Sequence, residues 1–211
     1  MFEKKVLERL YQRAEAPEDL PWHSVEPAKL LVEVVEQKDK PGRALDLGCG
    51  TGVYSVYLAR QGYEVTALDF IPKALQMAKE RGQVEKVKVN WIATDLLEWN
   101  STERFNLILD SGTLHTITAE KMPRYKEQLL SWLADDGDFI LAHWGRRHLL
   151  DWRPVGPRRR TRLEILQFLG PELREKAYQS ELVSGLPLLI GPHALTQSFW
   201  FQRSVAPTLS H

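Results

Sequence analysis

The residues of this sequence best suited to bind a ligand gather in a glycine-rich turn, ALDLGCGTG, at residues 44–52. The segment before the turn is typical of a buried strand, and the segment after it is typical of a helix. Gly48 and Gly50 let the backbone turn sharply and approach a ligand without an intervening Cβ, and Cys49 lies between them. The following helix starts with unpaired N–H groups and a partial positive charge. The turn is therefore predicted to hold a bound phosphate or carboxylate.

Acidic residues stand at the ends of three successive predicted strands. Asp46 precedes the glycine turn, at a place where a carboxylate can meet a cationic ammonium group. Asp69 ends the second strand, where a carboxylate accepts hydrogen bonds from ribose hydroxyls. Asp95 ends the third strand and can accept a hydrogen bond from an adenine amino group, although a lone Asp there is also typical of a helix cap or turn.

Two cofactor classes compete for this arrangement. A dinucleotide fold requires G-x-G-x-x-G, but Val53 stands at the position of the third glycine. The observed spacing is G-x-G-x-G with Asp46 two residues before it. S-adenosylmethionine carries an ammonium group that Asp46 can meet and NAD does not, so the sequence favours S-adenosylmethionine.

The elements that must position these residues alternate through the chain. Predicted strands cover residues 43–48, 63–69, 87–93, 105–110 and 139–144, and predicted helices cover 53–61, 72–82 and 119–133. This alternation is typical of a parallel, doubly wound sheet. The residues DDGD before the fifth strand predict a turn, and Thr161 with Glu164 predicts a capping box that starts a helix. Residues 178–184 and 198–203 read as two last strands that form a hairpin.

Four segments, ALDLGCGTG, VTALDF, ATDLLEW and FNLILDSGTLH, resemble the successive cofactor motifs of class I S-adenosylmethionine-dependent methyltransferases. The resemblance covers residues 41–145. It implies an α/β fold with a Rossmann-like, doubly wound, seven-stranded sheet, mostly parallel with an antiparallel last strand. It also implies that Asp69 holds the ribose, that Phe70 lies against the adenine, and that Asp95 and Leu96 border the base.

The chain of 211 residues fits one domain. Residues 1–40 are expected to form an N-terminal helical cover of that domain, and residues 41–211 to form the S-adenosylmethionine-binding part. Within the cover, an amphipathic helix is predicted over residues 2–14, and a second over residues 26–37 with Ser24 as its cap.

The methyl acceptor is expected at the carboxyl ends of the strands. Asp110 and His115 follow the fourth strand, His143 lies in the fifth, and Trp22 and Trp152 lie in loops near the same end. These positions make Asp110, His115 and His143 candidate catalytic residues, with Asp110 and Trp22 also candidate cofactor contacts. A thiol acceptor ionises with little help, whereas a hydroxyl or a protonated amine needs a base such as histidine. A histidine at a strand end more often has a structural role, so that alternative stays open for each of the two.

A finer resemblance links the chain to small-molecule methyltransferases of the thiopurine and tellurite-resistance type. It rests on LPWH, LDSGTLHTI and SFWFQR. Thiopurine methyltransferases carry an arginine directly after the strand-four aspartate, where this sequence has Ser111. The sequence also lacks the Asn/Asp-Pro-Pro-Tyr/Phe motif of adenine and glutamine methylases at residues 110–113. The expected acceptor is a small-molecule nucleophile, with thiols and chalcogen compounds considered first.

Charge and composition leave two alternatives open. Lys and Arg together number 28, as do Asp and Glu, so the formal net charge is zero, which disfavours a dedicated nucleic-acid binder. A cluster of arginines with Trp152 could nevertheless contact RNA; its members are Arg146, Arg147, Arg153, Arg158, Arg159, Arg160 and Arg162. The alternatives are thus an RNA or protein methyltransferase and a non-catalytic S-adenosylmethionine-binding protein.

Other features bound the protein's surroundings. The sequence has no long apolar run, so neither a membrane span nor a secretory signal is expected, and the expected location is cytoplasmic. No cluster of ligand residues predicts a metal, and the sequence leaves the oligomeric state open.

Overall fold

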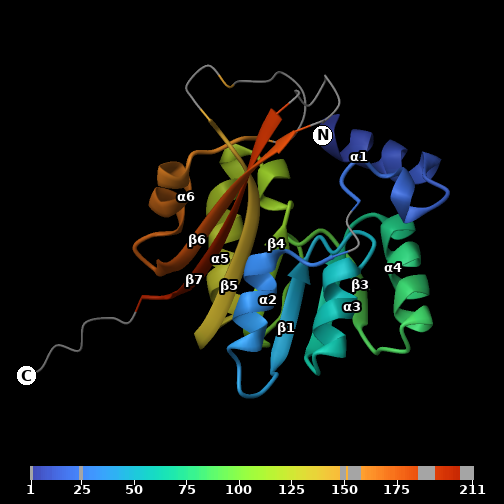
Figure 1. Ribbon diagram of the computed structural model, residues 1–211, viewed down its shortest axis with the longest axis horizontal. Coiled ribbons are helices and arrows are strands. Elements are labelled where there is room, and N and C mark those ends of the chain that lie inside the picture. The colour runs from blue at the N-terminus through green and yellow to red at the C-terminus, as the bar shows by residue number, and fades with distance from the viewer. Residues whose placement is uncertain (1, 24–25, 148–150, 152–157, 185–192, 205–211) are drawn as a thin grey trace, which may run out of the picture.

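Seven strands form one sheet in the order β3-β2-β1-β4-β5-β7-β6 (Figure 1). The structure is a computed structural model that describes residues 2–23, 26–147, 151, 158–184 and 193–204. The strands are β1 (Arg43–Leu47), β2 (Glu64–Asp69), β3 (Asn90–Ala93), β4 (Phe105–Ser111), β5 (Leu133–Gly145), β6 (Leu173–Ser184) and β7 (His193–Arg203). The helices are α1 (Phe2–Arg13), α2 (Lys29–Glu36), α3 (Val53–Arg60), α4 (Pro72–Val84), α5 (Met122–Trp132) and α6 (Arg162–Leu169), with short 3₁₀ turns at Pro17–Asp19, Leu114–Thr116 and Ala119–Lys121.

Strands β1 to β5 run parallel, and the strand order reverses between β1 and β4. In such sheets a ligand crevice opens at the reversal, outside the carboxyl ends of the strands. We call this end of the five parallel strands the carboxyl edge. Asp46 lies near the end of β1, Asp69 ends β2, and Asp110 lies beside Leu47 near the end of β4. The sheet therefore brings the three predicted acidic residues to one edge.

Strand β7 runs antiparallel to both of its neighbours, β5 and β6. The predicted terminal hairpin and antiparallel last strand are therefore confirmed. Both hairpin strands are longer than the sequence pattern indicated, since the pattern located them only at 178–184 and 198–203. The added residues mix apolar side chains such as Leu173 and Leu195 with polar ones, so they show no regular alternation in the sequence.

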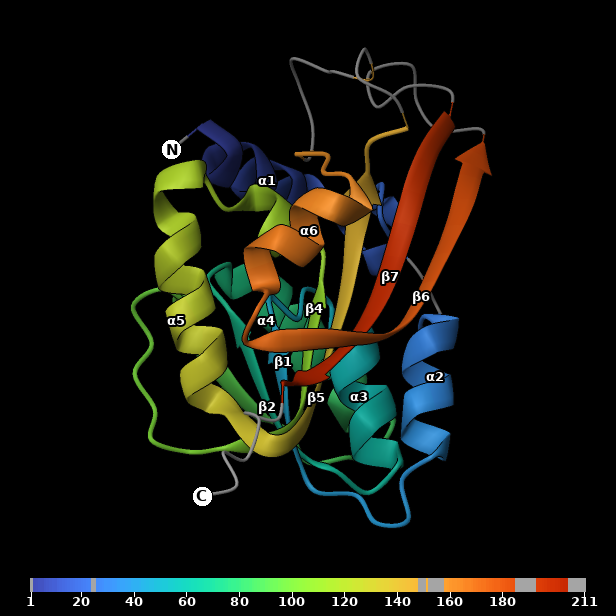
Figure 2. The same ribbon diagram turned by 90° about the vertical axis from the view of Figure 1, so that its left-hand side faces the viewer.

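Helices cover both faces of the sheet (Figure 2). On one face α2 and α3 contribute Leu31, Val34 and Leu58 to a core shared with strand residues Leu109 and Ile140. On the other face α5 and α6 pack over a larger core whose fully buried members include Trp132, Tyr125, Phe139, Phe199 and Phe201. Helix α1 lies over the carboxyl edge and packs against α4 through Tyr11, Ala14, Ala74 and Met77.

Several predicted element ends are wrong by a few residues. Helix α2 starts at Lys29 because Ala28 has extended backbone angles, φ −59° and ψ 137°, and Pro27 holds the residue before it away from helical angles. The predicted cap, Ser24, lies outside the described residues. Helix α4 continues past Gly82 because Gly82 is buried beneath the indole of Trp91, so its small size serves packing and does not end the helix.

Two further boundaries differ from the predicted ones. Residues 119–121 form a 3₁₀ turn before α5 begins at Met122. The DDGD segment is an irregularity within β5, since Leu133 pairs with Phe105 and Asp138 pairs with Leu107.

The predicted capping box is confirmed: the Thr161 hydroxyl accepts from the Glu164 backbone N–H, and the Glu164 carboxylate accepts from the Thr161 N–H. None of the helices in the described part of the chain has the length and apolar character needed to cross a bilayer.

Candidate cofactor and acceptor site

The glycine turn after β1 has the backbone that only glycine adopts easily. Gly48 and Gly50 have φ values of +68° and +55°. A Cβ on Gly48 would lie 2.0 Å from Thr113 Oγ1, and one on Gly50 would lie 2.9 Å from the Tyr11 hydroxyl. The turn is thus closed in by β4's following loop and by α1, and a side chain at either glycine would fill this space.

Asp69 joins the end of β2 to the glycine turn. Its carboxylate accepts a hydrogen bond from the Gly50 N–H at 2.9 Å and from the Ile71 N–H at 2.8 Å. The side chain is buried, and burial raises its pKa although both hydrogen bonds oppose the rise. Each carboxylate oxygen keeps a further lone pair, so Asp69 can accept from ribose hydroxyls while it holds the turn.

Asp46 lies beneath the turn and is 1% exposed. The Ser55 hydroxyl donates to it at 2.5 Å, and burial raises its pKa to about 7, with Asp110 and Asp69 adding to the rise. Within the described residues, no Lys, Arg or His forms an ion pair with Asp46. A buried carboxylate without a cation is costly, so this arrangement fits a ligand that brings a positive charge.

Tyr11 is a site residue that the sequence analysis missed. It lies on α1, is buried, and hydrogen-bonds Trp22, whose ring centroid is 5.8 Å away. Burial and the charge of Asp69 raise its pKa. Trp22 itself is 44% exposed. The sequence marks Tyr11 only as one residue of an amphipathic helix, and nothing in the spacing links it to Gly50.

The other predicted cofactor residues lie around the same turn. Phe70 packs beside α1, with Lys4 Nζ 4.5 Å from its ring centroid. Asp95 is partly exposed and its Oδ1 accepts from the Leu97 N–H, so it forms the turn that the sequence left open as an alternative. Leu96 is buried in the core over which α5 and α6 pack. Cys49 is also buried, and its backbone N–H donates a hydrogen bond to the Leu68 carbonyl.

Asp110 is fully buried and its hydrogen-bonding capacity is used within the protein. The Tyr125 hydroxyl donates to its Oδ2 at 2.6 Å, and the N–H groups of Thr113 and Leu114 donate at 2.7 to 3.2 Å. Burial raises its pKa to about 6. These contacts hold the backbone of the loop at Thr113 and Leu114, so Asp110 supports the loop that carries His115.

Both ring nitrogens of His143 are occupied. Nδ1 lies 2.7 Å from the Trp144 carbonyl and therefore carries the proton, which leaves Nε2 to accept from Arg160 Nη1 at 3.0 Å. Burial lowers the pKa of His143 to about 4. His143 is thus neutral and has no lone pair free to take a proton from an acceptor.

His115 differs from His143 in its contacts. Its ring meets that of His143 edge-on, with centroids 5.8 Å apart and planes at 79°. Its Nδ1 is buried and has no hydrogen-bond partner in the part of the chain that the structure describes. Burial lowers the pKa of His115 well below its usual range, and His143, Arg160 and Arg158 add to this. His115 is therefore a neutral imidazole at the carboxyl edge, beside the end of β4.

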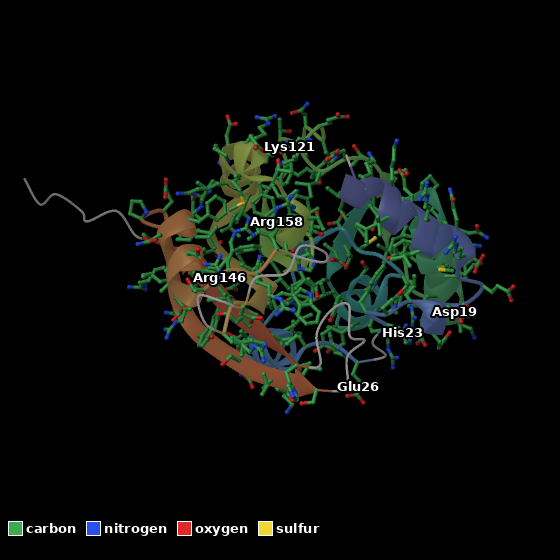
Figure 3. The ribbon with its side chains drawn as sticks, turned by 90° about the horizontal axis from the view of Figure 1, so that it is seen from above. Asp19, His23, Glu26, Lys121, Arg146 and Arg158 are labelled. Atoms are coloured by element: carbon green, nitrogen blue, oxygen red, sulfur yellow. The ribbon has the colours of Figure 1, made fainter. Side chains whose placement is uncertain are left out.

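The arginines after β5 are engaged by carboxylates and carbonyl oxygens. The ion pairs are Arg146 with Glu164 at 3.4 Å, Arg147 and Arg159 with Asp151 at 3.0 and 2.8 Å, and Arg162 with Glu175. The contacts of Arg147 and Arg159 hold the pKa of Asp151 at about 2, with burial opposing them. Figure 3 shows Lys121, Arg146 and Arg158 toward the α5 and α6 side of the carboxyl edge, and Asp19, His23 and Glu26 toward the α1 and α2 side. Trp152 and Arg153 lie outside the described residues.

No three His, Cys, Asp or Glu side chains in the described ranges gather as a metal site would require. Asp46, Asp69 and the glycine turn thus form one group at the ends of β1 and β2, and His115 lies at the end of β4. The first group combines two buried carboxylates with a turn that carries no side chain at Gly48 and Gly50.

Comparison with known proteins agrees with this geometry. The family model described as "Methyltransferase domain" matches residues 44–137. A 2-heptyl-1-hydroxyquinolin-4(1H)-one methyltransferase of Mycobacteroides abscessus is 31% identical over 138 residues, which cover 61% of this chain and 60% of that protein. Thiocyanate methyltransferase 1 of Arabidopsis thaliana is 31% identical over 140 residues, which cover 65% of this chain and 62% of that protein. The chain thus spans about three fifths of the length of these relatives.

A solved structure extends the match over nearly the whole fold. The 1,6-didemethyltoxoflavin-N1-methyltransferase of Burkholderia thailandensis, solved with bound 1,6-didemethyltoxoflavin and S-adenosylhomocysteine, has a TM-score of 0.71 and 20% identity, covering 97% of this chain and 89% of that one. At this identity the match shows the fold alone. Together with the family match over residues 44–137 and the strand order, it shows that the chain has the fold of S-adenosylmethionine-dependent methyltransferases and is similar to them in its glycine-turn region.

Proposed function

We propose that the protein transfers a methyl group from S-adenosylmethionine to a small-molecule nucleophile and releases S-adenosylhomocysteine. The observation that carries the proposal is Asp46, a buried carboxylate with a pKa of about 7 and no cation among the described residues, directly beneath a glycine turn. A ligand with an ammonium group supplies the missing charge. The fold match and the family match support the same reading.

We assign the first group to the cofactor, together with further residues around the turn. Asp69 accepts hydrogen bonds from the ribose hydroxyls, Phe70 lies against the adenine, and Asp95 with Leu96 borders the base. Gly48, Cys49 and Gly50 follow the methionine part, and Asp46 attracts its ammonium group through charge. Tyr11 joins this set because its hydroxyl lies against Gly50, and Trp22 holds Tyr11 in place.

S-adenosylmethionine supplies a sulfonium methyl group that a nucleophile can displace in line. The protein's part is to align the acceptor and exclude water, which contributes about 7–11 kcal/mol in well-oriented pairs. His115, held neutral, accepts the proton of a hydroxyl acceptor. Asp110 and His143 support the loop and the ring beside it, because neither has a free lone pair at the edge.

The acceptor class we propose is a small thiol, chalcogen compound or acidic hydroxyl. Ser111 in place of an arginine argues against a thiopurine, and the names of the two relatives, a thiocyanate and a hydroxyquinolone methyltransferase, support small sulfur and oxygen nucleophiles. The pairing of Arg146, Arg147, Arg159 and Arg162 with acidic side chains disfavours an RNA-binding stripe. A cytoplasmic location is part of the proposal, and cell fractionation tests it.

The direct test is release of S-adenosylhomocysteine against a panel of small thiols, aromatic thiols, selenite, tellurite, phenols, amines and bulk RNA. We expect release with sulfur, chalcogen or hydroxyl acceptors and none with RNA. The Asp69→Ala variant serves as the control, since the loss of charge-assisted hydrogen bonds is expected to weaken S-adenosylmethionine binding about tenfold, or about 1.4 kcal/mol.

Release of S-adenosylhomocysteine with RNA alone would show that the protein is an RNA methyltransferase and contradict the proposal of a small-molecule acceptor. Tight S-adenosylmethionine binding with no release for any acceptor would favour a non-catalytic binding protein. If a folded Asp69→Ala variant binds S-adenosylmethionine with unchanged affinity, Asp69 does not bind the ribose.

A further inference from the structure

The segment 158–160 crosses the loop that carries His115. The Arg158 N–H donates to the His115 carbonyl at 3.1 Å, and Arg158 Nη1 donates to the Thr116 carbonyl at 3.0 Å. Arg160 Nη1 lies 3.5 Å from the Leu114 carbonyl. Three successive carbonyl groups of the loop thus contact this one segment.

Arg160 is anchored in the sheet on its other side. Its N–H donates to the Trp144 carbonyl at 3.2 Å, and its carbonyl accepts from Gln197 Nε2 at 2.9 Å. A residue fixed by both backbone groups holds its side chain in a defined direction. Its guanidinium donates to His143 Nε2 at 3.0 Å and contacts Met122 Sδ at 3.4 Å.

The charges that face His115 come from four elements. Arg158 and Arg160 stand on the crossing segment, and the neutral His143 stands on β5. On β4, Asp110 is occupied by Tyr125 of α5 and by backbone N–H groups. On α6, Glu164 caps the helix and pairs with Arg146. Glu120 interacts with the charge of Arg158, and Glu164 with that of Arg160, so carboxylates offset part of the positive charge on this side of His115.

We propose that Arg160 is a positioning residue for the acceptor site: its guanidinium, held at the Leu114 carbonyl and at His143 Nε2, fixes the His143 ring beside that of His115. The proposal rests on the proposed function for its catalytic meaning. The effect of Arg160 on the His115 ring does not depend on the proposed function. A like charge near an imidazole disfavours the protonated ring, and locking His143 stops that ring from accepting a proton in place of His115.

The first test is an NMR titration of the His115 ring, with its resonance identified by its absence in His115→Gln. In the unmodified protein we expect the ring to titrate well below its usual range, as its burial requires. In Arg160→Gln we expect the midpoint to rise by about one pH unit, the size expected for removing a nearby charge. Arg162→Gln is the matched control: Arg162 lies two residues away and pairs with Glu175, so we expect no change.

The second test is the pH profile of methyl transfer to a phenol and to a thiol. In Arg160→Gln the acidic limb of the phenol profile is expected to move toward neutral pH, while the thiol profile, which needs no base, keeps its shape. If Arg160 had only a structural role, Arg160→Gln would lower the rates of methyl transfer to the phenol and to the thiol by the same factor. If Arg160→Gln does not fold, Arg160→Met takes its place, because it removes the charge and keeps a long side chain, and the His115 midpoint is again expected to rise by about one pH unit.

An unchanged His115 midpoint in folded Arg160→Gln overturns the inference, whatever the activity. A shifted midpoint with no methyl transfer from any acceptor keeps the electrostatic role of Arg160 and overturns the proposed function. The two failures are therefore distinguishable.

Discussion

Asp46 shows how a single side chain links folding, pH and ligand affinity. Its pKa in the folded protein is about 7, against 3.8 for an unperturbed Asp, because it is buried. The folded state therefore holds a proton that the unfolded chain releases. This stabilisation is complete below the unfolded value and is lost as the pH rises through about 7.

In the absence of a ligand, the buried Asp46 favours its protonated form. A bound ammonium group favours the ionised carboxylate instead. We expect S-adenosylmethionine to bind about tenfold more tightly at about pH 7.5 than at about pH 5.5, as calorimetry at several pH values would measure. In Asp46→Asn the affinity is expected to be lower and nearly independent of pH over this range. A pH dependence that survives in Asp46→Asn would assign the titration to another group.

The residue scale also shows what the sequence does and does not reveal. The residue types and spacing place Asp46, Asp69 and His115 at the carboxyl edge, where the structure has them. They do not reveal that His143 is occupied by Arg160, because that contact joins segments whose pairing only the folded sheet creates. Tyr11 was missed for the same reason: its partner Gly50 is distant in sequence.

At the scale of elements, Thr161 illustrates a boundary that local chemistry decides. Its hydroxyl and the Glu164 carboxylate satisfy each other's backbone N–H groups at the start of α6. We expect Thr161→Ala to cost about 1 kcal/mol and to lower the Tm by about 2–4 °C in a thermal melt. Thr102→Ala, at an exposed loop position, is the control. Equal Tm values for the two variants would show that the capping box contributes nothing measurable.

Where tertiary packing decides an element's end, the sequence misleads. Gly82 predicts a helix end because glycine is rare inside helices. The structure instead packs the indole of Trp91 against Gly82 and ends α4 near Lys86, whose φ is +55°. The strand and helix order was predictable because apolar periodicity is local, whereas the end of α4 depends on a residue in β3.

At the scale of the whole molecule, residues 1–40 divide into two parts with different roles. Helix α1 lies over the carboxyl edge, but α2 supplies Leu31 and Val34 to the core beneath the sheet. Lys38, after α2, also pairs with the buried Asp138 of β5, which accepts hydrogen bonds from Trp200 and Gln202 of β7. The segment therefore belongs to the packing of the domain.

Deleting residues 1–13 removes α1 with its Tyr11 and no other helix or strand. The protein is therefore expected to unfold cooperatively still, but to bind S-adenosylmethionine more weakly. Deleting residues 1–40 is expected to prevent folding, since apolar side chains such as Leu109 and Ile140 lose their cover. Circular dichroism and thermal melts compare the two. A folded, cooperative 41–211 fragment would instead make the segment a separable cover.

The position of β7 between β5 and β6 has a consequence for the order in which a newly made chain can assemble. Strand β5 leaves the ribosome long before residues 193–203, yet its free edge has no other partner in the described sheet. At synthesis rates of about 5–20 residues per second, that edge waits a few seconds with its backbone groups unpaired. The nascent protein thus passes through a stage with an open, apolar strand edge, the stage at which chaperones act and at which crowded chains aggregate.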